Sequence, residues 1–338
     1  MLTSLKINDN QSNAISVIRA ISAIMIVLCH IFQGVDSELA WWFNVGVQIF
    51  LFMSGFLMAK DYIESAMIFL KKRCAKILIP YYVFLVLIIL VYSLFGISVS
   101  LESIFTYIFC LQGITYANVI PGLEHLWFVS IIMLCYILTL LLNTLRSRIS
   151  ERQSIFLIMF LLVIIQIVVN ISILPVAFGA RIGAFVLGYF VACKSRYDMS
   201  KTFVVNVFIV TLTTLLIRLY YTYINTINSV EINDLFNSYF VNWQHTLLGI
   251  FIFIAIYYYI SKSSEKKNIR FLNVISKYSY EIYLVHQVFI LGPISILFIT
   301  KNIALNVVII LSLIMISSKI VYEVVKCLKY FAVEKATN

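Results

Sequence analysis

Long apolar runs, separated by short polar segments, occupy the chain from residue 15 to residue 325. A helix that crosses the hydrocarbon layer of a bilayer needs about 20 mostly apolar residues. A transmembrane β-barrel would instead show alternating segments of about ten residues, which are absent from this sequence. The pattern predicts an all-α integral membrane protein, a bundle of about ten transmembrane helices. The predicted spans are 15–33, 40–59, 77–97, 126–143, 154–172, 176–193, 202–224, 239–260, 275–297 and 303–325.

The polar segments between the predicted spans alternate in charge. Lysine and arginine are concentrated in segment 60–76, in segment 144–153, and in every second connection after these. The other connections hold acidic residues and a single cation, Lys301. Because cationic loops stay in the cytoplasm, both termini are predicted to be cytoplasmic and the number of spans to be even.

The composition agrees with this reading and narrows the function classes. The chain has 338 residues, of which 62% are apolar and 12% charged. A soluble domain would be about 25% charged, so a soluble enzyme, a disordered chain and a coiled coil are excluded. The net charge of +10 is explained by basic loops that face an anionic leaflet, without nucleic acid. We expect one transmembrane domain over residues 1–338, with no appended soluble domain.

The longest outer connection, 98–125, contains an apolar stretch at 101–115. This stretch is too short to cross a bilayer. It predicts either an interfacial helix or a re-entrant helix over the outer face.

Ionisable side chains inside a membrane span are costly, which makes them candidates for function. Arg19 and His30 stand eleven residues apart, which is three helical turns plus about 20°, so they share one face about 16 Å apart. A snorkelling arginine and a hydrogen-bonded buried histidine are the structural alternative. The full set within the spans is Arg19, His30, Arg181, Arg218, His245, Glu281, His286 and Lys319.

Several further positions allow two interpretations. His125 and Trp127 open the fourth span, where an interfacial aromatic belt is the simpler reading. His286 lies near the middle of the ninth span, which favours a function. Arg181 and Arg218 lie near outer ends, where they either snorkel or hold an anionic substrate group. The sequence lacks a P-loop, a G-x-S-x-G elbow and an HExxH motif, and its four histidines lack metal-ligand spacing, so no metal is expected.

Five blocks, in order along nearly the whole chain, resemble the membrane-bound acyltransferase 3 family, whose members O-acylate bacterial polysaccharides. They are an Arg-x10-His motif from Arg19 to His30, GVQIFLFMSGFL at 46–57, the basic stretch KRCAKILIPY at 72–81, HLWF at 125–128 and SKYSYEIYLVHQ at 276–287. The resemblance implies an O-acyltransferase of a bacterial cytoplasmic membrane that moves an acetyl or other short acyl group from cytosolic acyl-CoA, with acetyl-CoA as the default donor. The implied acceptor is a hydroxyl of a capsule, exopolysaccharide or other surface glycan.

The resemblance also implies roles for the candidate residues. His30 would be the general base or the acyl carrier, with Arg19 guiding the cofactor inward. His286 and His125 would orient the acceptor or the catalytic imidazole. The remaining implied contacts are those of Arg73, Lys76 and Lys72 with the phosphates of CoA, and those of Arg181, Arg218 and Trp127 with the substrate.

The chain departs from the family pattern in two places. Ile132 occupies a position that is acidic in many members, and Cys135 stands where they carry phenylalanine. The second cation of the inner basic motif is Lys76 rather than arginine.

Two other functions remain open on the sequence. One is a transporter or exporter of a glycan or lipid-linked sugar, which polar residues at mid-depth would also serve. Transporters often carry matched helix breaks in two halves, whereas the four prolines here, at 80, 121, 175 and 293, do not pair. The other is a structural subunit of a polysaccharide synthase, which would leave the buried arginine and histidine unexplained.

Overall fold

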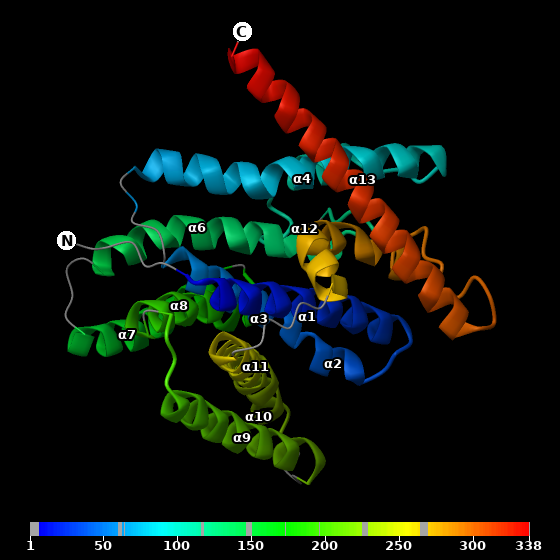
Figure 1. The fold of residues 1–338 in the computed structure, drawn as a ribbon. Coiled ribbons are helices and arrows are strands. Elements are labelled where there is room, and N and C mark those ends of the chain that lie inside the picture. The colour runs from blue at the N-terminus through cyan, green and yellow to red at the C-terminus, as the bar shows by residue number, and fades with distance from the viewer. Residues whose placement is uncertain are drawn as a thin grey trace. The chain divides into compact units, whose positions relative to one another are not determined.

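The computed structural model describes residues 7–59, 63, 65–115, 118–146, 151–172, 174–195, 197–224, 229–263 and 270–337. Every regular element in these ranges is helical, and Figure 1 colours them in chain order. The elements are α1 (Asp9–Gly34), α2 (Leu39–Phe43), α3 (Val45–Met58), α4 (Ala66–Leu94), α5 (Leu101–Ile108), η1 (Glu124–Leu126), α6 (Trp127–Arg146), α7 (Glu151–Ile171), α8 (Ala177–Ser195), α9 (Lys201–Tyr223), α10 (Val230–Leu235), η2 (Phe236–Val241), α11 (Asn242–Lys262), α12 (Arg270–Ile290) and α13 (Ile303–Thr337).

Eight helical stretches of the described chain are long and apolar enough to cross a membrane. They confirm a multi-pass helical membrane protein, and they cover all but two of the predicted spans. The span predicted at 154–172 lies on α7, whose apolar part, Phe156–Ile171, is shorter. The span predicted at 275–297 lies on α12, which is more polar than the others and ends at Ile290. Pro293 lies three residues beyond this end, and a helix usually ends before a proline.

The predicted orientation of the spans rests on the lysines and arginines of the loops, and six of these cations lie outside the described residues. The predicted cytoplasmic location of both termini therefore stays a prediction. The cations that lie outside the described residues are Lys6, Lys60, Arg148, Arg196, Lys266 and Lys267.

The chain divides into two compact units, each built from separate segments of sequence. Unit 1 comprises Met1–Ser22, Asn44–Glu64 and Ile137–Ile269. Unit 2 comprises Ala23–Phe43, Ser65–Tyr136 and Arg270–Asn338. Helices α1 and α6 each contribute residues to both units.

Unit 1 is organised around a close contact between α3 and α8. A Cβ atom on Gly55 would lie 1.9 Å from the carbonyl oxygen of Phe185, and one on Gly188 would lie 2.1 Å from that of Phe52. Both distances are impossible, so only glycine allows the two backbones to touch. Small residues at helix crossings are typical of membrane bundles, where close backbone packing replaces the hydrophobic effect. Gly55 belongs to the GVQIFLFMSGFL block, so this packing explains one residue of that motif.

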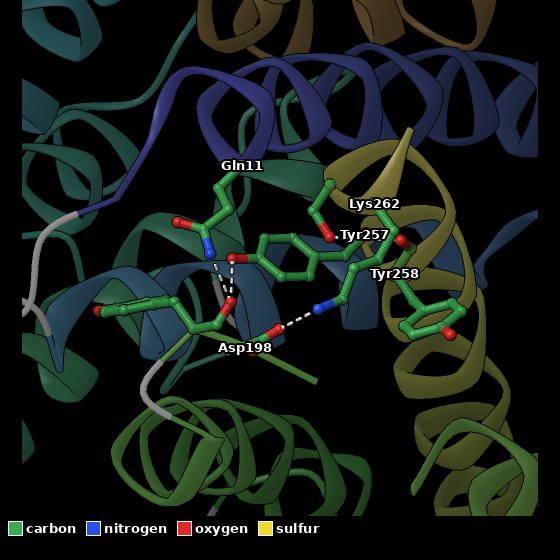
Figure 2. Close-up of polar contacts among 7 residues, drawn as sticks. Gln11, Asp198, Tyr257, Tyr258 and Lys262 are labelled. Atoms are coloured by element: carbon green, nitrogen blue, oxygen red, sulfur yellow. Dashed lines mark hydrogen bonds and ion pairs between the residues drawn. The ribbon is translucent and has the colours of Figure 1, made fainter. Parts of the chain in front are cut away.

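A buried tyrosine, Tyr197, is bonded to α1, α3 and α11 of unit 1. Figure 2 labels two of its partners, Gln11 and Tyr257. The hydroxyl of Tyr197 donates to the carbonyl oxygen of Phe56 at 3.0 Å. The carbonyl oxygen of Tyr197 accepts from the Gln11 amide at 2.7 Å and from the Tyr257 hydroxyl at 2.9 Å. These bonds fix the turn between α8 and α9 against α1, α3 and α11.

In unit 2, the segment after α4 folds back along that helix. Tyr81 of α4 donates to the carbonyl oxygen of Tyr107 at 2.7 Å, and Tyr92 donates to that of Pro121 at 2.8 Å. Because Tyr81 and Tyr92 are eleven residues apart, the segment runs back by about 16 Å before it returns. Of the two alternatives predicted for 101–115, this arrangement favours the re-entrant helix. Tyr107 in turn donates to the carbonyl oxygen of Leu123 at 3.1 Å, which fixes the chain directly before η1.

Helix α12 is held between α4 and α13. The Tyr280 hydroxyl donates to the carbonyl oxygen of Ile77 in α4 at 3.0 Å. The ammonium group of Lys277 lies 4.9 Å from the ring centre of Tyr278 and 4.8 Å from that of Tyr322 in α13. These contacts set the position of the histidine that α12 carries.

Candidate functional site: a cluster of three imidazoles

Three of the four histidines meet in unit 2, each from a different element. His30 comes from the last turns of α1, His125 from η1 and His286 from α12. The ring centre of His286 lies 4.7 Å from that of His30 and 4.7 Å from that of His125. The centres of His30 and His125 are 6.2 Å apart. His286 is therefore the middle member of the cluster.

Backbone carbonyls fix which ring nitrogens carry protons. Nδ1 of His286 lies 2.7 Å from the carbonyl oxygen of Tyr283 and 3.2 Å from that of Ile282. A carbonyl oxygen only accepts, so Nδ1 of His286 carries the proton and Nε2 of the neutral ring holds the lone pair. Nδ1 of His30 lies 3.0 Å from the carbonyl oxygen of Ile26 and 3.1 Å from Nε2 of His286. Both neighbours accept, so Nδ1 of His30 is the donor.

The same reasoning identifies the reactive atom of His30. With the proton on Nδ1, Nε2 of the neutral ring has an available lone pair. His30 is also partly accessible, whereas His286 is fully buried and His125 is 4% exposed. His30 is thus the member of the cluster that can reach a substrate, with its base nitrogen ready for a proton or an acyl group.

His125 is held by residues of α12 on both its backbone and its ring. Its Nε2 donates to the carbonyl oxygen of Leu284 at 3.1 Å. Its backbone N–H donates to Oε1 of Gln287 at 3.2 Å, and its carbonyl oxygen accepts from the Tyr283 hydroxyl. Three bonds from one helix therefore fix the imidazole at the mouth of α6. Because His125 is 4% exposed and has these three partners, it fits a member of the imidazole cluster better than a residue of an interfacial aromatic belt.

Glu124 extends this support away from the imidazoles. Nε2 of Gln287 donates to Oε2 of Glu124 at 2.6 Å, and the backbone N–H of Gly122 donates to Oε1 at 3.0 Å. A hydrogen bond to an ionised acceptor is stronger than one between neutral groups. Glu124 therefore orients the Gln287 amide, which presents its oxygen to His125.

Nδ1 of His125 carries the second available lone pair of the cluster, after that on Nε2 of His30. The ring proton is on Nε2, and Nδ1 is buried with no hydrogen-bond partner in the described part of the chain. The cluster thus has two unprotonated nitrogens without an internal donor to fill them, on His30 and on His125. Among the described residues, no group of three or more His, Cys, Asp and Glu side chains could hold a metal ion.

The basic stretch predicted to bind the cofactor lies on the first turns of α4. Lys72 and Lys76 are exposed, and the half-buried Arg73 guanidinium lies 5.6 Å from the ring centre of Phe69. The stretch ends beside Ile77, the residue to which Tyr280 bonds. Six residues of α12, about 9 Å, separate Tyr280 from His286. The basic stretch and the imidazole cluster therefore both belong to unit 2. The basic stretch lies near Tyr280 of α12, and the cluster lies further along that helix, at His286.

The other predicted residues lie elsewhere. Arg19 shares α1 with His30 as the periodicity predicted, and its segment belongs to unit 1. Arg181 and Arg218 also belong to unit 1. Trp127 is half-buried at the start of α6, two residues after His125.

Three supporting residues were not among the predicted site residues: Tyr283, Gln287 and Glu124. Each stands inside a block that carried the family resemblance or directly beside one, and that is the signal that could have found them. Ile132, the apolar substitute for an acidic residue, is 1% exposed. No carboxylate is thus available at that position, and no carboxylate bonds any of the three imidazoles in the described chain.

Comparison with known proteins identifies the family of the chain. No curated protein matches the chain, and no solved structure does. Residues 12–323 match the acyltransferase 3 family, described as an acyltransferase domain. This match covers far more than half of the sequence and includes all three histidines of the cluster. The chain therefore belongs to the acyltransferase 3 family of membrane proteins.

Proposed function

We propose that this protein is an O-acyltransferase that moves an acetyl or other short acyl group from cytosolic acyl-CoA to a hydroxyl of a bacterial surface glycan. The observation that carries the proposal is the tautomer of His30. Its Nδ1–H donates within the protein, which leaves Nε2 as a base on the accessible side of a buried cluster. A positioned imidazole can take or give a proton near neutral pH, and such catalysis contributes about 10²–10⁴-fold.

Two reaction routes use the same atom. In direct transfer, Nε2 of His30 takes the proton of the acceptor hydroxyl while its oxygen attacks the thioester carbon. The thiolate of CoA leaves and receives that proton from His30. In the covalent route, Nε2 itself attacks the thioester carbon and the thiolate of CoA leaves, which gives an acyl-imidazolium. The oxygen of the acceptor hydroxyl then attacks the acyl carbon, the bond from that carbon to Nε2 breaks, and the hydroxyl proton passes to the thiolate. Both routes give the same ester and free CoA.

His286 has a distinct role in either route. Its Nε2 accepts from Nδ1 of His30, so it stabilises the positive charge that develops when Nε2 of His30 gains a proton or an acyl group. Full burial keeps His286 from the substrates, which makes it a positioning residue. His125, which is 4% exposed with a buried Nδ1, is likewise a positioning residue next to His286.

The donor end of the reaction is assigned to the basic stretch of α4. Arginine and lysine bind phosphates through charge-assisted hydrogen bonds, and Lys72, Arg73 and Lys76 form such a set. The predicted cytoplasmic side of this segment supports a cytosolic acyl-CoA, with acetyl-CoA as the simplest donor. Arg19 would guide the acyl arm along α1 toward His30, and the half-buried Trp127 would contact the sugar.

The test is transfer of radiolabelled acetyl from acetyl-CoA in inverted membrane vesicles, with total host glycan as acceptor. His30→Ala should abolish the label in glycan without loss of inserted protein. Cys29→Ala is the matched control, because it truncates the neighbouring residue, which points about 100° round the helix. Full activity in His30→Ala would exclude His30 as base and as carrier.

Two further outcomes have defined meanings. Loss of label in both variants would indicate damage to α1 rather than loss of a base. An absence of label with the natural chain, despite inserted protein and glycan that can be acylated, would favour a glycan or lipid-linked sugar transporter. Because no contact of the described residues specifies the glycan, its hydroxyl or the acyl group, these are determined by analysis of the labelled product.

A further inference from the structure

A charged side chain that neither reaction route uses stands directly beside the imidazole cluster. Glu124 is exposed, opens η1 and directly precedes His125 in the chain. Successive Cα atoms are about 3.8 Å apart, so Glu124 is the immediate neighbour of a cluster member. The ring centre of His125 lies 6.2 Å from that of His30, the partly accessible member of the cluster. A solvent-exposed carboxylate therefore lies close to the place where the acceptor hydroxyl has to bind.

The internal bonds of Glu124 fix its orientation without using up its acceptor capacity. Its Oε2 accepts from Nε2 of Gln287 at 2.6 Å, and its Oε1 accepts from the backbone N–H of Gly122 at 3.0 Å. An ionised carboxylate has about four acceptor positions, so about half of them remain for a ligand. Among the described residues, no lysine or arginine lies within ion-pair distance of this carboxylate. Its negative charge is thus fixed in place and is not neutralised by that part of the chain.

Trp127 lies on the same side of the turn as Glu124. The element η1 is a 3-10 helix, in which side chains three residues apart are eclipsed. The backbone N–H of Trp127 donates to the carbonyl oxygen of Glu124, which confirms this turn geometry between the two residues. Trp127 is half-buried. One turn of the chain therefore presents a carboxylate and an indole together, with His125 between them in sequence.

This pair of side chains matches the chemistry of an uncharged sugar ring. A sugar presents hydroxyl donors around its edge and apolar C–H bonds on its face. An ionised carboxylate accepts hydrogen bonds only, and a bond from a hydroxyl to such an acceptor is charge-assisted. An indole supplies a flat, rigid apolar surface. A sugar with its own carboxylate or phosphate at this position would instead meet a like charge, which is repulsive.

We propose that Glu124 binds hydroxyls of the acceptor sugar next to the one that is acylated, and thereby selects a sugar without negative charge. Trp127 contacts the C–H face of the same sugar. The inference rests on the proposed function, because it names the class of acceptor for that reaction. The interaction of two unit charges a few ångströms apart near a protein surface predicts a preference of about tenfold or more for the uncharged sugar.

The experiment measures acetyl transfer by the full-length protein in nanodiscs, which leave both faces of the protein open to substrates. The donor is radiolabelled acetyl-CoA. The acceptors are fragments of host surface glycan from which existing esters have been removed, separated by anion exchange into a neutral and a uronate-containing fraction. A third acceptor is the uronate fraction after chemical reduction of its carboxylates to alcohols. The readout is the ratio of kcat/KM for the neutral fraction to kcat/KM for the uronate fraction.

Three variants separate the charge of Glu124 from its structural contacts. Glu124→Gln removes the charge and should lower the ratio about tenfold. Glu124→Asp keeps the charge and should keep the preference for the neutral fraction, even where its shorter side chain lowers the rate. Glu231→Gln removes an exposed carboxylate from α10 of unit 1, and it should leave the ratio unchanged. Loss of the contact with Gln287 alone would lower kcat for both fractions equally, so it does not change the ratio.

The outcomes distinguish this inference from the proposed function. A preference for neutral fragments in the natural chain and in Glu124→Asp, with better transfer to the uronate fraction after reduction, supports the inference, and a loss of preference in Glu124→Gln completes it. Transfer that favours the unreduced uronate fraction, or an equal ratio in the natural chain and in Glu124→Gln, overturns the inference and leaves the acyltransferase intact. An absence of transfer to every fraction by the natural chain overturns both.

Discussion

The replacement of His286 by leucine tests the proposed support of the base. Leucine keeps an apolar side chain in the fully buried position but cannot accept the Nδ1 proton of His30, which lies 3.1 Å from Nε2 of His286. When His30 becomes charged in the transition state, this hydrogen bond becomes charge-assisted. Bonds to charged groups contribute about 1.5–3 kcal/mol. The loss therefore predicts a rate about 10–150-fold lower.

His286→Gln separates acceptance of the bond from the presence of an imidazole. A glutamine side chain can place its oxygen near the position of Nε2, so it can accept from His30 but cannot relay a proton. We expect this variant to lose less than about tenfold, since a neutral acceptor of similar reach is restored. Transfer is measured as the initial rate at saturating acyl-CoA in inverted vesicles, normalised to inserted protein. The KM for acyl-CoA should be unchanged, because His286 is buried away from the substrates.

The pattern of the two variants decides between roles. If His286→Leu were as inactive as His30→Ala, and His286→Gln were no better, His286 would have to transfer a proton itself. If both variants kept the natural rate, the bond between the imidazoles would have no part in catalysis. A lower unfolding midpoint with an unchanged rate per folded molecule would make His286 purely structural.

Three further predictions concern the packing, the support of His125 and the donor site. Gly55→Leu should lower the unfolding midpoint in nanodiscs or prevent insertion, since overpacking costs about 1–3 kcal/mol or more; an unchanged midpoint would contradict the contact with Phe185. Gln287→Leu should cost about 1–3 kcal/mol, because it leaves the buried N–H of His125 without an acceptor, and it should lower the transfer rate; equal stability and rate would remove this support. Arg73→Gln should raise the KM for acyl-CoA with little change in kcat, and a lowered kcat at constant KM would argue against a phosphate contact.

Much of the fold could be predicted because each span carries its own signal. Apolar length identified most of the helices, and a 100° step per residue placed Arg19 and His30 on one face of α1. Apolar length did not predict the course of the chain where contacts with neighbouring helices determine it. The C-terminal end of the span at α12 was predicted seven residues too late, since apolar residues continue beyond Gly292 and Pro293 although the backbone turns there. The course of segment 101–115 back along α4 depends on hydrogen bonds from Tyr81 and Tyr92, and local hydropathy gives no signal for such bonds.

The site could be predicted only in part. The cost of burying polar groups indicated His30 and His286, and the family resemblance added His125. The residues that orient them act across long separations: Gln287 bonds the backbone of His125, 162 positions away. Periodicity relates neighbours on one helix and gives no information on such pairs. The tautomers depend on which carbonyl oxygens lie near each ring, and those positions follow only from three-dimensional structure.

Among the described residues, no carboxylate is hydrogen-bonded to any of the three imidazoles, and this has a physical explanation. A carboxylate next to His30 would be a permanent charge in a segment that lies within the bilayer, where an isolated charge is expensive. Each imidazole is bonded to a carbonyl oxygen, and His30 is also bonded to His286, so the resting cluster carries no formal charge. Charge then develops only while His30 holds a proton or an acyl group, and Nε2 of His286 is already placed to stabilise it. The folded protein at rest therefore does not carry the free-energy cost of a buried charge, and the hydrogen bond from His30 to His286 offsets that cost in the transition state.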